Sequence, residues 1–177
     1  MSRSIFLKKF INKKVLITGH TGFKGSWLTT IMSNSVAKIY GISKNYPSSF
    51  YKSLKLKNVK NYIFDLKNLE ITKKTILKIK PDFIFHLAAQ SIVSKSYINP
   101  IETWNSNLIS FLNVLESLRF LKKKCSCVMI TSDKCYLNKE KKNGYKENEI
   151  LGGFDNYSSS KASWEILFKS YYHSYFK

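Results

Sequence analysis

Tyr157 and Lys161 carry the side chains best suited to proton transfer, and they lie four positions apart. On a helix, residues i and i+4 share one face, so these two side chains would be neighbours. An ammonium beside a phenol favours the phenolate, which can then act as a base. The Y-x-x-x-K pattern is common, however, so it gains weight only from the elements around it.

A second group of reactive residues consists of Thr131, Ser132, Asp133 and Lys134, which lie at the end of a predicted strand over 125–131. Ligands of parallel α/β sheets bind beyond the carboxyl ends of the strands, which is where these residues would lie. Their hydroxyl, carboxylate and amine could serve as hydrogen-bond donor, acid and base. The same residues would equally suit a polar turn with a helix cap.

Three glycines, Gly19, Gly22 and Gly25, follow the apolar run 15–17 and precede a predicted helix over 26–32. Strand, glycine-rich turn and helix form the layout that places a phosphate on a helix N-terminus, where free N–H groups and the helix dipole favour an anion. Gly19 would allow the tight turn, Gly22 the approach of a pyrophosphate, and Gly25 close packing of the helix on the strand. The pattern therefore predicts a dinucleotide site.

The second predicted strand, 36–42, is followed by Ser43, Lys44 and Asn45 and by no acidic residue. NAD-binding units commonly place an Asp or Glu there, where it binds the adenosine ribose 2′-hydroxyl. This argument therefore does not separate NAD from NADP. Lys44 would either face a 2′-phosphate or lie in solvent.

Apolar runs and helical spacing predict alternating strands and helices along the chain. We expect strands over residues 14–18, 36–42, 62–64, 83–87 and 125–131, and helices over 26–32, 67–78, 101–121 and 156–176. This alternation predicts a Rossmann-like, doubly wound parallel α/β sheet with helices on both faces. Residues 1–13 would be a loosely held basic lead-in to one domain over 14–177. Phe23, Trp27, Leu28 and Ile31 are expected in the core.

Composition limits the remaining classes. The net charge is +19, but the lysines are scattered, so we expect no nucleic-acid partner. No run of about 18 apolar residues and no signal peptide are visible, which predicts a cytoplasmic protein without a membrane span. Three cysteines argue against a disulfide framework, and Cys125 and Cys127 without a second pair make a poor metal site, so no metal is expected.

Taken together, these motifs resemble the extended short-chain dehydrogenases/reductases, in the branch of sugar-nucleotide epimerases and dehydratases. The resemblance rests on Gly19, Gly22 and Gly25, on 86–90, and on Asn107, Ser132, Tyr157 and Lys161. The stretches 18–28, 131–136 and 151–161 look like the 4,6-dehydratases of that branch that act on CDP-glucose. Asp133 and Lys134 are the most specific feature, because dTDP-glucose enzymes have Asp-Glu there.

The resemblance implies tightly held NAD as cofactor and CDP-glucose as substrate. The implied NAD site consists of Gly19, His20, Gly22, Phe23, Lys24, Gly25, Asp65, Leu66, Ala88, Ala89, Gln90, Asn107, Tyr157 and Lys161. Asp65 would also suit a plain strand-end turn, and His86 and His173 are expected to be structural. The net reaction would be loss of water, giving CDP-4-keto-6-deoxyglucose for deoxysugar and lipopolysaccharide O-antigen biosynthesis.

The implied catalytic residues are Ser132, Asp133, Lys134, Tyr157 and Lys161. Tyr157, held as phenolate by Lys161 and bonded through Ser132, would take the proton of the sugar 4-hydroxyl. Lys134 would remove the C5 proton, and Asp133 would protonate the departing 6-hydroxyl. Lys134 can do so only if burial beside Lys161 and the nicotinamide drives off its own proton.

Length separates this chain from the family it resembles, whose members continue for a similar distance with a sixth strand and a small substrate lobe. We therefore expect an N-terminal half, truncated before that lobe, that is an enzyme or a part of one. Another enzyme of the branch, such as an epimerase, and a catalytically inactive NAD-binding fragment are the alternatives. The two long helices, 101–121 and 157–176, would form a homodimer interface, although their apolar stripes fit core packing equally well.

Overall fold

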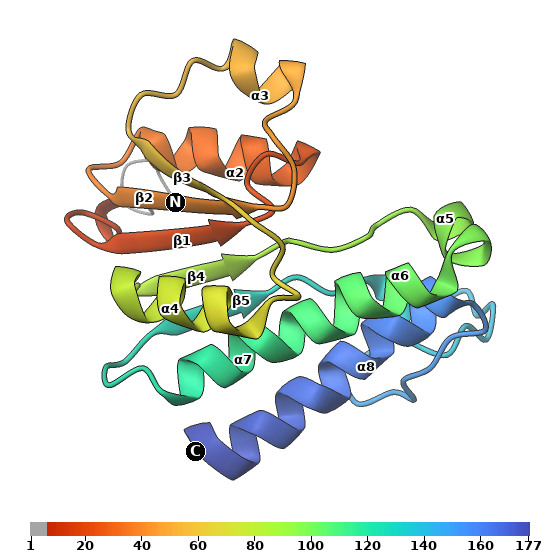
Figure 1. Cartoon of the computed structure of the whole chain (residues 1–177). Helices are drawn as coiled ribbons and strands as arrows, with labels where there is room; N and C mark the ends of the chain where they lie inside the picture. Colours follow the sequence, from red (N-terminus) through yellow and green to blue (C-terminus); the bar gives the residue numbers. More distant parts are fainter. Residues whose placement is uncertain (1–6) are drawn as a thin grey trace.

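The structure is a computed structural model that describes residues 7–177, so residues 1–6 of the predicted lead-in lie outside the described part. Its centre is one sheet of five parallel strands in the order β3-β2-β1-β4-β5 (Figure 1). The strands are β1 (Lys14–Thr18), β2 (Lys38–Ser43), β3 (Val59–Ile63), β4 (Phe83–His86) and β5 (Ser126–Met129). The chain builds outward from β1 to β3, then returns to β4, so the strand order reverses between β1 and β4. Open α/β sheets bind ligands at such a reversal.

Helices cover both faces of the sheet, as the doubly wound prediction requires. They are α2 (Phe23–Ser33), α3 (Ser49–Ser53), α4 (Leu69–Ile79), α5 (Val93–Ile98), α6 (Pro100–Trp104), α7 (Ser110–Arg119) and α8 (Asn156–Tyr171). A π-helical turn, Asn105–Ile109, joins α6 to α7, so the predicted long helix over 101–121 is present. Figure 1 shows α2 on one face and α4, α7 and α8 on the other. The short helices α3 and α5 were not predicted.

The helix α2 turns a different side to the sheet from the one its apolar residues predict. Phe23 and Trp27 are 74% and 51% exposed, and Ile31 is also exposed, whereas Thr29 and Met32 are buried. The prediction that Phe23, Trp27 and Ile31 belong to the core is therefore wrong. The physical reason lies at the start of the helix, where glycine and serine allow α2 to approach the strands more closely than large side chains would.

The described part of the lead-in, residues 7–13, belongs to the packed domain and is not loosely held. The Phe10 ring is buried, with its centroid 4.8 Å from that of Phe83 and 6.1 Å from that of Phe85. The backbone N–H of Asn12 donates to the carbonyl of Val36 at 3.1 Å. Burial of an aromatic ring explains this order, because the gain offsets the entropy lost by fixing the chain.

None of the helices within residues 7–177 has the length and apolar character needed to cross a bilayer.

Candidate cofactor and catalytic site

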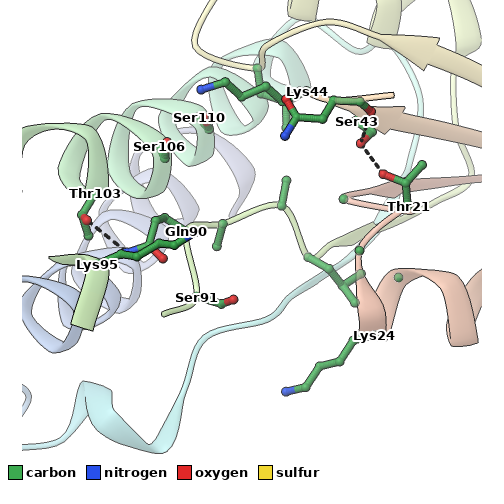
Figure 2. Close-up of a pocket in the computed structure, with 18 of the residues that line it drawn as sticks. Thr21, Lys24, Ser43, Lys44, Gln90, Ser91, Lys95, Thr103, Ser106 and Ser110 are labelled. Atoms are coloured by element: carbon green, nitrogen blue, oxygen red, sulfur yellow. Dashed lines mark hydrogen bonds between the residues drawn. The ribbon is translucent and has the colours of Figure 1, made fainter. Parts of the chain in front are cut away.

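One cleft of about 1040 Å³ opens at the carboxyl ends of the strands, where the strand order reverses. Figure 2 shows its wall on both sides, with Lys24 on α2 and with Gln90 and Lys95 near α5 and α6. Twelve of the residues predicted to bind the cofactor line it: Gly19, Gly22, Phe23, Lys24, Gly25, Asp65, Leu66, Ala88, Ala89, Gln90, Tyr157 and Lys161. The fold thus brings together residues from four separate segments of the chain.

The glycine turn has no room for side chains. Gly19 has a φ of +70°, and a Cβ there would lie 2.9 Å from the backbone of Ala88. A Cβ on Gly25 would lie 2.8 Å from Gly19 C and His20 Cα, and closer still to Gly19 O. Gly22 caps α2 without a side-chain hydrogen bond, and no acidic residue lies in the first turn. The start of α2 is therefore free to receive an anion.

The floor of the cleft is held by hydrogen bonds beneath Ala88. The Ala88 N–H donates to Thr18 Oγ1 at 3.2 Å, and that hydroxyl lies 2.7 Å from His86 Nδ1. His86 is fully buried beside the rings of Phe111 and Trp164. Burial, together with the charge of Lys161, lowers the pKa of His86 to about 3. His86 is accordingly a neutral structural residue, as predicted.

Asn107 supports the cleft from behind and does not line it. Its Oδ1 accepts the Gln90 N–H at 2.8 Å, and its Nδ2 donates to the Gln90 carbonyl and to Ser160 Oγ. It lies within the π-helical turn, whose altered backbone is often found at functional sites. Its carbonyl also accepts the indole N–H of Trp164 at 2.9 Å. Asn107 therefore positions Gln90, which does line the cleft.

Tyr157 and Lys161 both lie in the cleft wall on the first turns of α8, with their side chains largely buried. The Lys161 Nζ donates to the carbonyl of Ile130 at 3.2 Å and lies 3.6 Å from the centre of the Trp164 ring. Lys161 is only 3% exposed. This burial, with a smaller contribution from the charge of Lys24, lowers the pKa of Lys161 to about 7. The ammonium is thus poised to gain or lose its proton near neutral pH.

Ser132, Asp133 and Lys134 follow β5 as predicted, but they form a capped polar turn outside the cleft lining. The Ser132 hydroxyl donates to Asp133 Oδ1 at 3.0 Å and accepts the Lys134 N–H at 3.3 Å. Within residues 7–177, no hydrogen bond joins Ser132 to Tyr157. Lys134 is exposed, so the burial beside Lys161 that the sequence analysis required is not found.

The side chain of His20 does not reach the cleft, contrary to expectation. The ring is fully buried beneath the sheet edge, where its Nε2 lies 2.7 Å from Asn61 Oδ1. A Cβ on Gly41 would lie 2.5 Å from that Nε2, so glycine in β2 leaves the space that the ring occupies. Burial also lowers the pKa of His20. This side chain serves packing under β2.

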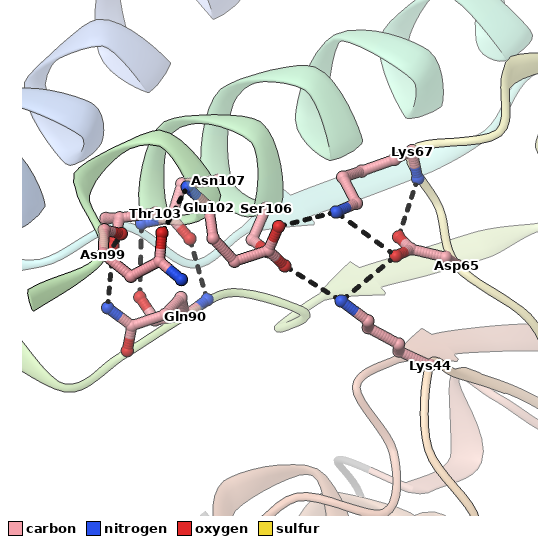
Figure 3. Close-up of polar contacts among 9 residues, drawn as sticks. All are labelled: Lys44, Asp65, Lys67, Gln90, Asn99, Glu102, Thr103, Ser106 and Asn107. Atoms are coloured by element: carbon pink, nitrogen blue, oxygen red, sulfur yellow. Dashed lines mark hydrogen bonds and ion pairs between the residues drawn. The ribbon is translucent and has the colours of Figure 1, made fainter. Parts of the chain in front are cut away.

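Several cleft residues were missed or left open by the sequence analysis. Thr21 Oγ1 and Ser43 Oγ are 2.6 Å apart at the end of β2 (Figure 2). Beside them, Lys44 forms ion pairs with Asp65 and with Glu102 of α6 (Figure 3). Small hydroxyl residues directly after a glycine turn and a strand were the available signal for Thr21 and Ser43. Nothing local marked Glu102, because its partners lie 35 and 58 positions away.

Among residues 7–177, no group of three or more His, Cys, Asp or Glu side chains is arranged so that it could hold a metal ion.

Comparison with known proteins identifies the family to which this chain is similar. The family described as GDP-mannose 4,6 dehydratase matches residues 16–176. CDP-glucose 4,6-dehydratase of Salmonella typhimurium is 38% identical over 167 residues, covering 93% of this chain and 46% of that protein. The dTDP-D-glucose 4,6-dehydratase of Dictyostelium discoideum is 30% identical, covering 92% of this chain and 41% of that protein. The chain spans about half the length of these curated relatives.

Solved structures agree on the fold. An epimerase from Methanothermobacter thermautotrophicus superimposes with a TM-score of 0.85 at 22% identity, covering 98% of this chain and 51% of that one. UDP-glucose 4-epimerase from Brucella ovis, solved with NAD, gives a TM-score of 0.81 at 18% identity and covers 92% and 49%. With the family match over residues 16–176, the chain belongs to the GDP-mannose 4,6-dehydratase family of nucleotide-sugar dehydratases and epimerases.

Proposed function

We propose that this chain provides the NAD-binding half and the proton-transfer residues of a nucleotide-sugar 4,6-dehydratase that acts on CDP-glucose. The observation that carries the proposal is the buried pair Tyr157 and Lys161 in the wall of a cleft that ends on the glycine turn. The relative from Salmonella typhimurium, a CDP-glucose 4,6-dehydratase, supports the choice of substrate. The product would be CDP-4-keto-6-deoxyglucose, a precursor of deoxysugars in surface polysaccharides.

The residues of the cleft fit a dinucleotide. The first turn of α2 offers free N–H groups behind Gly22 for a pyrophosphate, and Gly19 and Gly22 present no side chain to it. Two solved relatives of the same fold, the UDP-glucose 4-epimerases of Brucella ovis and Thermus thermophilus, contain NAD. When bound, NAD⁺ supplies a reversible hydride acceptor, so the reaction can be redox-neutral.

Tyr157 would take the proton of the sugar 4-hydroxyl. Lys161 would assist this transfer through its positive charge, because it lies one helical turn away on the same face of α8. Because the pKa of Lys161 is near 7, this help should weaken as pH rises above neutral. A 4-ketone would form only with the C4 hydride also taken up by the bound cofactor, and this ketone would acidify the neighbouring C5 proton. Return of that hydride to C6 after water has left would give the 6-deoxy product and leave the cofactor oxidised again.

Lys134 and Asp133 would complete the dehydration, as base for the C5 proton and as acid for the leaving 6-hydroxyl. Both are exposed next to the carboxyl end of β5, and bound sugar nucleotide would have to bury them. We expect Lys134→Met to lower dehydration about 100-fold, while exchange of the C4 hydride with NAD partly survives. Product formation and isotope exchange measure the two steps separately.

Lys142→Met is the control for this variant, since Lys142 is also exposed and lies in the following loop. It should leave both steps unchanged. Full dehydration in Lys134→Met would show that another group takes the C5 proton.

The substrate assignment is tested by incubating the chain with NAD⁺ and CDP-glucose and following the ultraviolet absorbance of a 4-keto-6-deoxy sugar in base. Reactions with dTDP- and GDP-sugars run alongside. Product from CDP-glucose only is the expected result. Product from another nucleotide sugar would contradict the substrate, and no product despite a rise in melting temperature with NAD⁺ would contradict catalysis by this chain alone.

Epimerization is the alternative activity, because UDP-glucose 4-epimerase of Mycoplasma genitalium also matches, at 29% identity over 78% of this chain. An epimerase would invert C4 and leave the 6-hydroxyl in place, so product analysis separates the two.

We further propose a homodimer through the helices over 101–121 and 157–176, which sedimentation would test. Cytoplasmic location and the absence of a nucleic-acid partner stay predictions from the sequence.

A further inference from the structure

Four alternating charges meet at one end of the cleft, and they come from three separate segments of the chain. Lys44 follows β2, Asp65 and Lys67 follow β3, and Glu102 lies on α6 (Figure 3). Glu102 is 2.9 Å from the Lys44 ammonium and 2.8 Å from that of Lys67. Asp65 lies 3.2 Å from Lys44 and 3.6 Å from Lys67. We call these four residues the charge network.

The network occupies the end of β2, where an NAD-binding unit commonly carries an acid for the ribose 2′-hydroxyl and where a nearby cation accommodates a 2′-phosphate. This chain has Lys44 there instead of an acid. Lys44, Asp65 and Glu102 all line the cleft. Two carboxylates are therefore present at this end of the cleft, Asp65 from the loop after β3 and Glu102 from α6, although β2 itself supplies none.

Glu102 and Lys44 are both charged at neutral pH. Hydrogen bonds from Lys67, then Lys44 and Ser106, lower the pKa of Glu102 to about 2. The hydrogen bond to Glu102 raises the pKa of Lys44. Two ammonium and two carboxylate groups thus cancel, and the cleft end carries no net positive charge from these four side chains.

We propose that Glu102 makes this cleft select NAD over NADP by neutralising Lys44. The proposal rests on the dinucleotide site of the proposed function and adds its specificity determinant. A 2′-phosphate would meet a lysine that already has two carboxylate partners, and it would stand close to both of those negative charges. A 2′-hydroxyl has no such penalty, because it can donate to a carboxylate and accept from an ammonium.

The variant Glu102→Gln tests this directly, because it removes the charge and keeps the shape. Dissociation constants for NAD⁺ and NADP⁺ are measured by calorimetry with the complete chain at low salt. We expect the natural chain to prefer NAD⁺ and Glu102→Gln to shift the ratio of the two constants toward NADP⁺ about tenfold. Adding Lys44→Met to Glu102→Gln should remove that gain, since Lys44 is the cation that the first change exposes.

Glu102→Asp and Glu116→Gln complete the set. The first keeps the negative charge and should retain the preference for NAD⁺. The second removes a carboxylate that pairs with Arg119 on α7, outside the cleft, and should leave the ratio unchanged. A loss of folding would change both affinities together, whereas the proposal concerns their ratio, and Glu102→Asp separates the two effects.

Three results would overturn the inference. These are an unchanged ratio in Glu102→Gln, a natural chain that prefers NADP⁺, and a shift that survives Lys44→Met. Binding of neither nucleotide to the folded natural chain would instead overturn the proposed dinucleotide site, so the two failures are distinguishable.

Discussion

Replacing Gly25 with alanine is expected to abolish NAD⁺ binding and to lower the free energy of unfolding by about 3 kcal/mol. The new methyl group would lie within 2.8 Å of Gly19 C and His20 Cα, and still closer to Gly19 O. All three are backbone atoms, so no flexible side chain can yield. The start of α2 would have to move away from the turn. Its backbone N–H groups would then no longer point at the place where the pyrophosphate is expected to bind.

Gly144→Ala is the matched control for this variant. A Cβ at Gly144 would meet nothing within 4 Å, so stability and binding should stay close to those of the natural chain. Urea unfolding and calorimetry with NAD⁺ measure the two effects. Natural affinity in Gly25→Ala would show that the turn does not hold the cofactor.

Lys161→Met should make the protein more stable and inactive at the same time. Lys161 is buried with its pKa lowered from 10.5 to about 7, so the folded protein holds its proton less tightly than the unfolded chain does. We expect the variant to gain on the order of 2 kcal/mol at about pH 7, after loss of the bond to Ile130 and of the contact with Trp164. Oxidation of the sugar should fall by about 1000-fold or more, because proton transfer to Tyr157 would lose the help of the neighbouring positive charge.

The pH dependence follows from the same shift. Between about pH 7 and about pH 10 the unfolded chain keeps the Lys161 proton while the folded protein has released it. Stability of the natural chain relative to Lys161→Met should therefore rise with pH, by up to about 1.4 kcal/mol per unit. The gap between the two proteins should be widest at or below pH 7 and should close toward alkaline pH.

Urea unfolding at several pH values checks this prediction. Lys169→Met is its control, because Lys169 lies on the same helix but is exposed, and it should show no such pH-dependent gap. A destabilised Lys161→Met, or a gap that does not vary with pH, would mean that Lys161 is protonated as readily in the folded protein as in the unfolded chain.

The sequence predicted the sheet well, because its signals are local. Every predicted strand overlaps an observed one. The signal is strongest for β1 and β2, whose apolar runs are largely buried, as in parallel sheets covered on both faces. Tyr157 and Lys161 were placed correctly for a similar reason: a spacing of four fixes two side chains on one helix face. Gly19, Gly22 and Gly25 were recognised from their position between a strand and a helix.

The choice of packing face on α2 could not be predicted from helical spacing. Phe23, Trp27 and Ile31 share a helix side, and such a stripe normally marks the core. Here close approach to the strands selected the side with Gly25 and Thr29, and the apolar stripe stayed exposed. Residue spacing distinguishes the apolar side of α2 from the small and polar side. The close approach of the start of α2 to the glycine turn decides which of these sides packs on the sheet.

Polar contacts between residues far apart in the chain could not be predicted from the sequence either. Asn107 was expected at the cofactor, yet it lies behind the cleft lining and fixes Gln90 from 17 positions away. His20 was expected at the cofactor, yet Asn61 and the space left by Gly41 draw its ring under the sheet. Such contacts depend on how strands and helices stack, which no local pattern specifies.

Calorimetric titration of the 177-residue chain with NAD⁺ tests whether the glycine turn holds the cofactor. Circular dichroism first establishes that the protein is folded. We expect saturable binding of one NAD⁺ per chain, with the binding heat lost in Gly25→Ala and kept in Gly144→Ala. A folded chain that takes up no NAD⁺, or that binds it equally well with alanine at position 25, would contradict a cofactor site on the glycine turn.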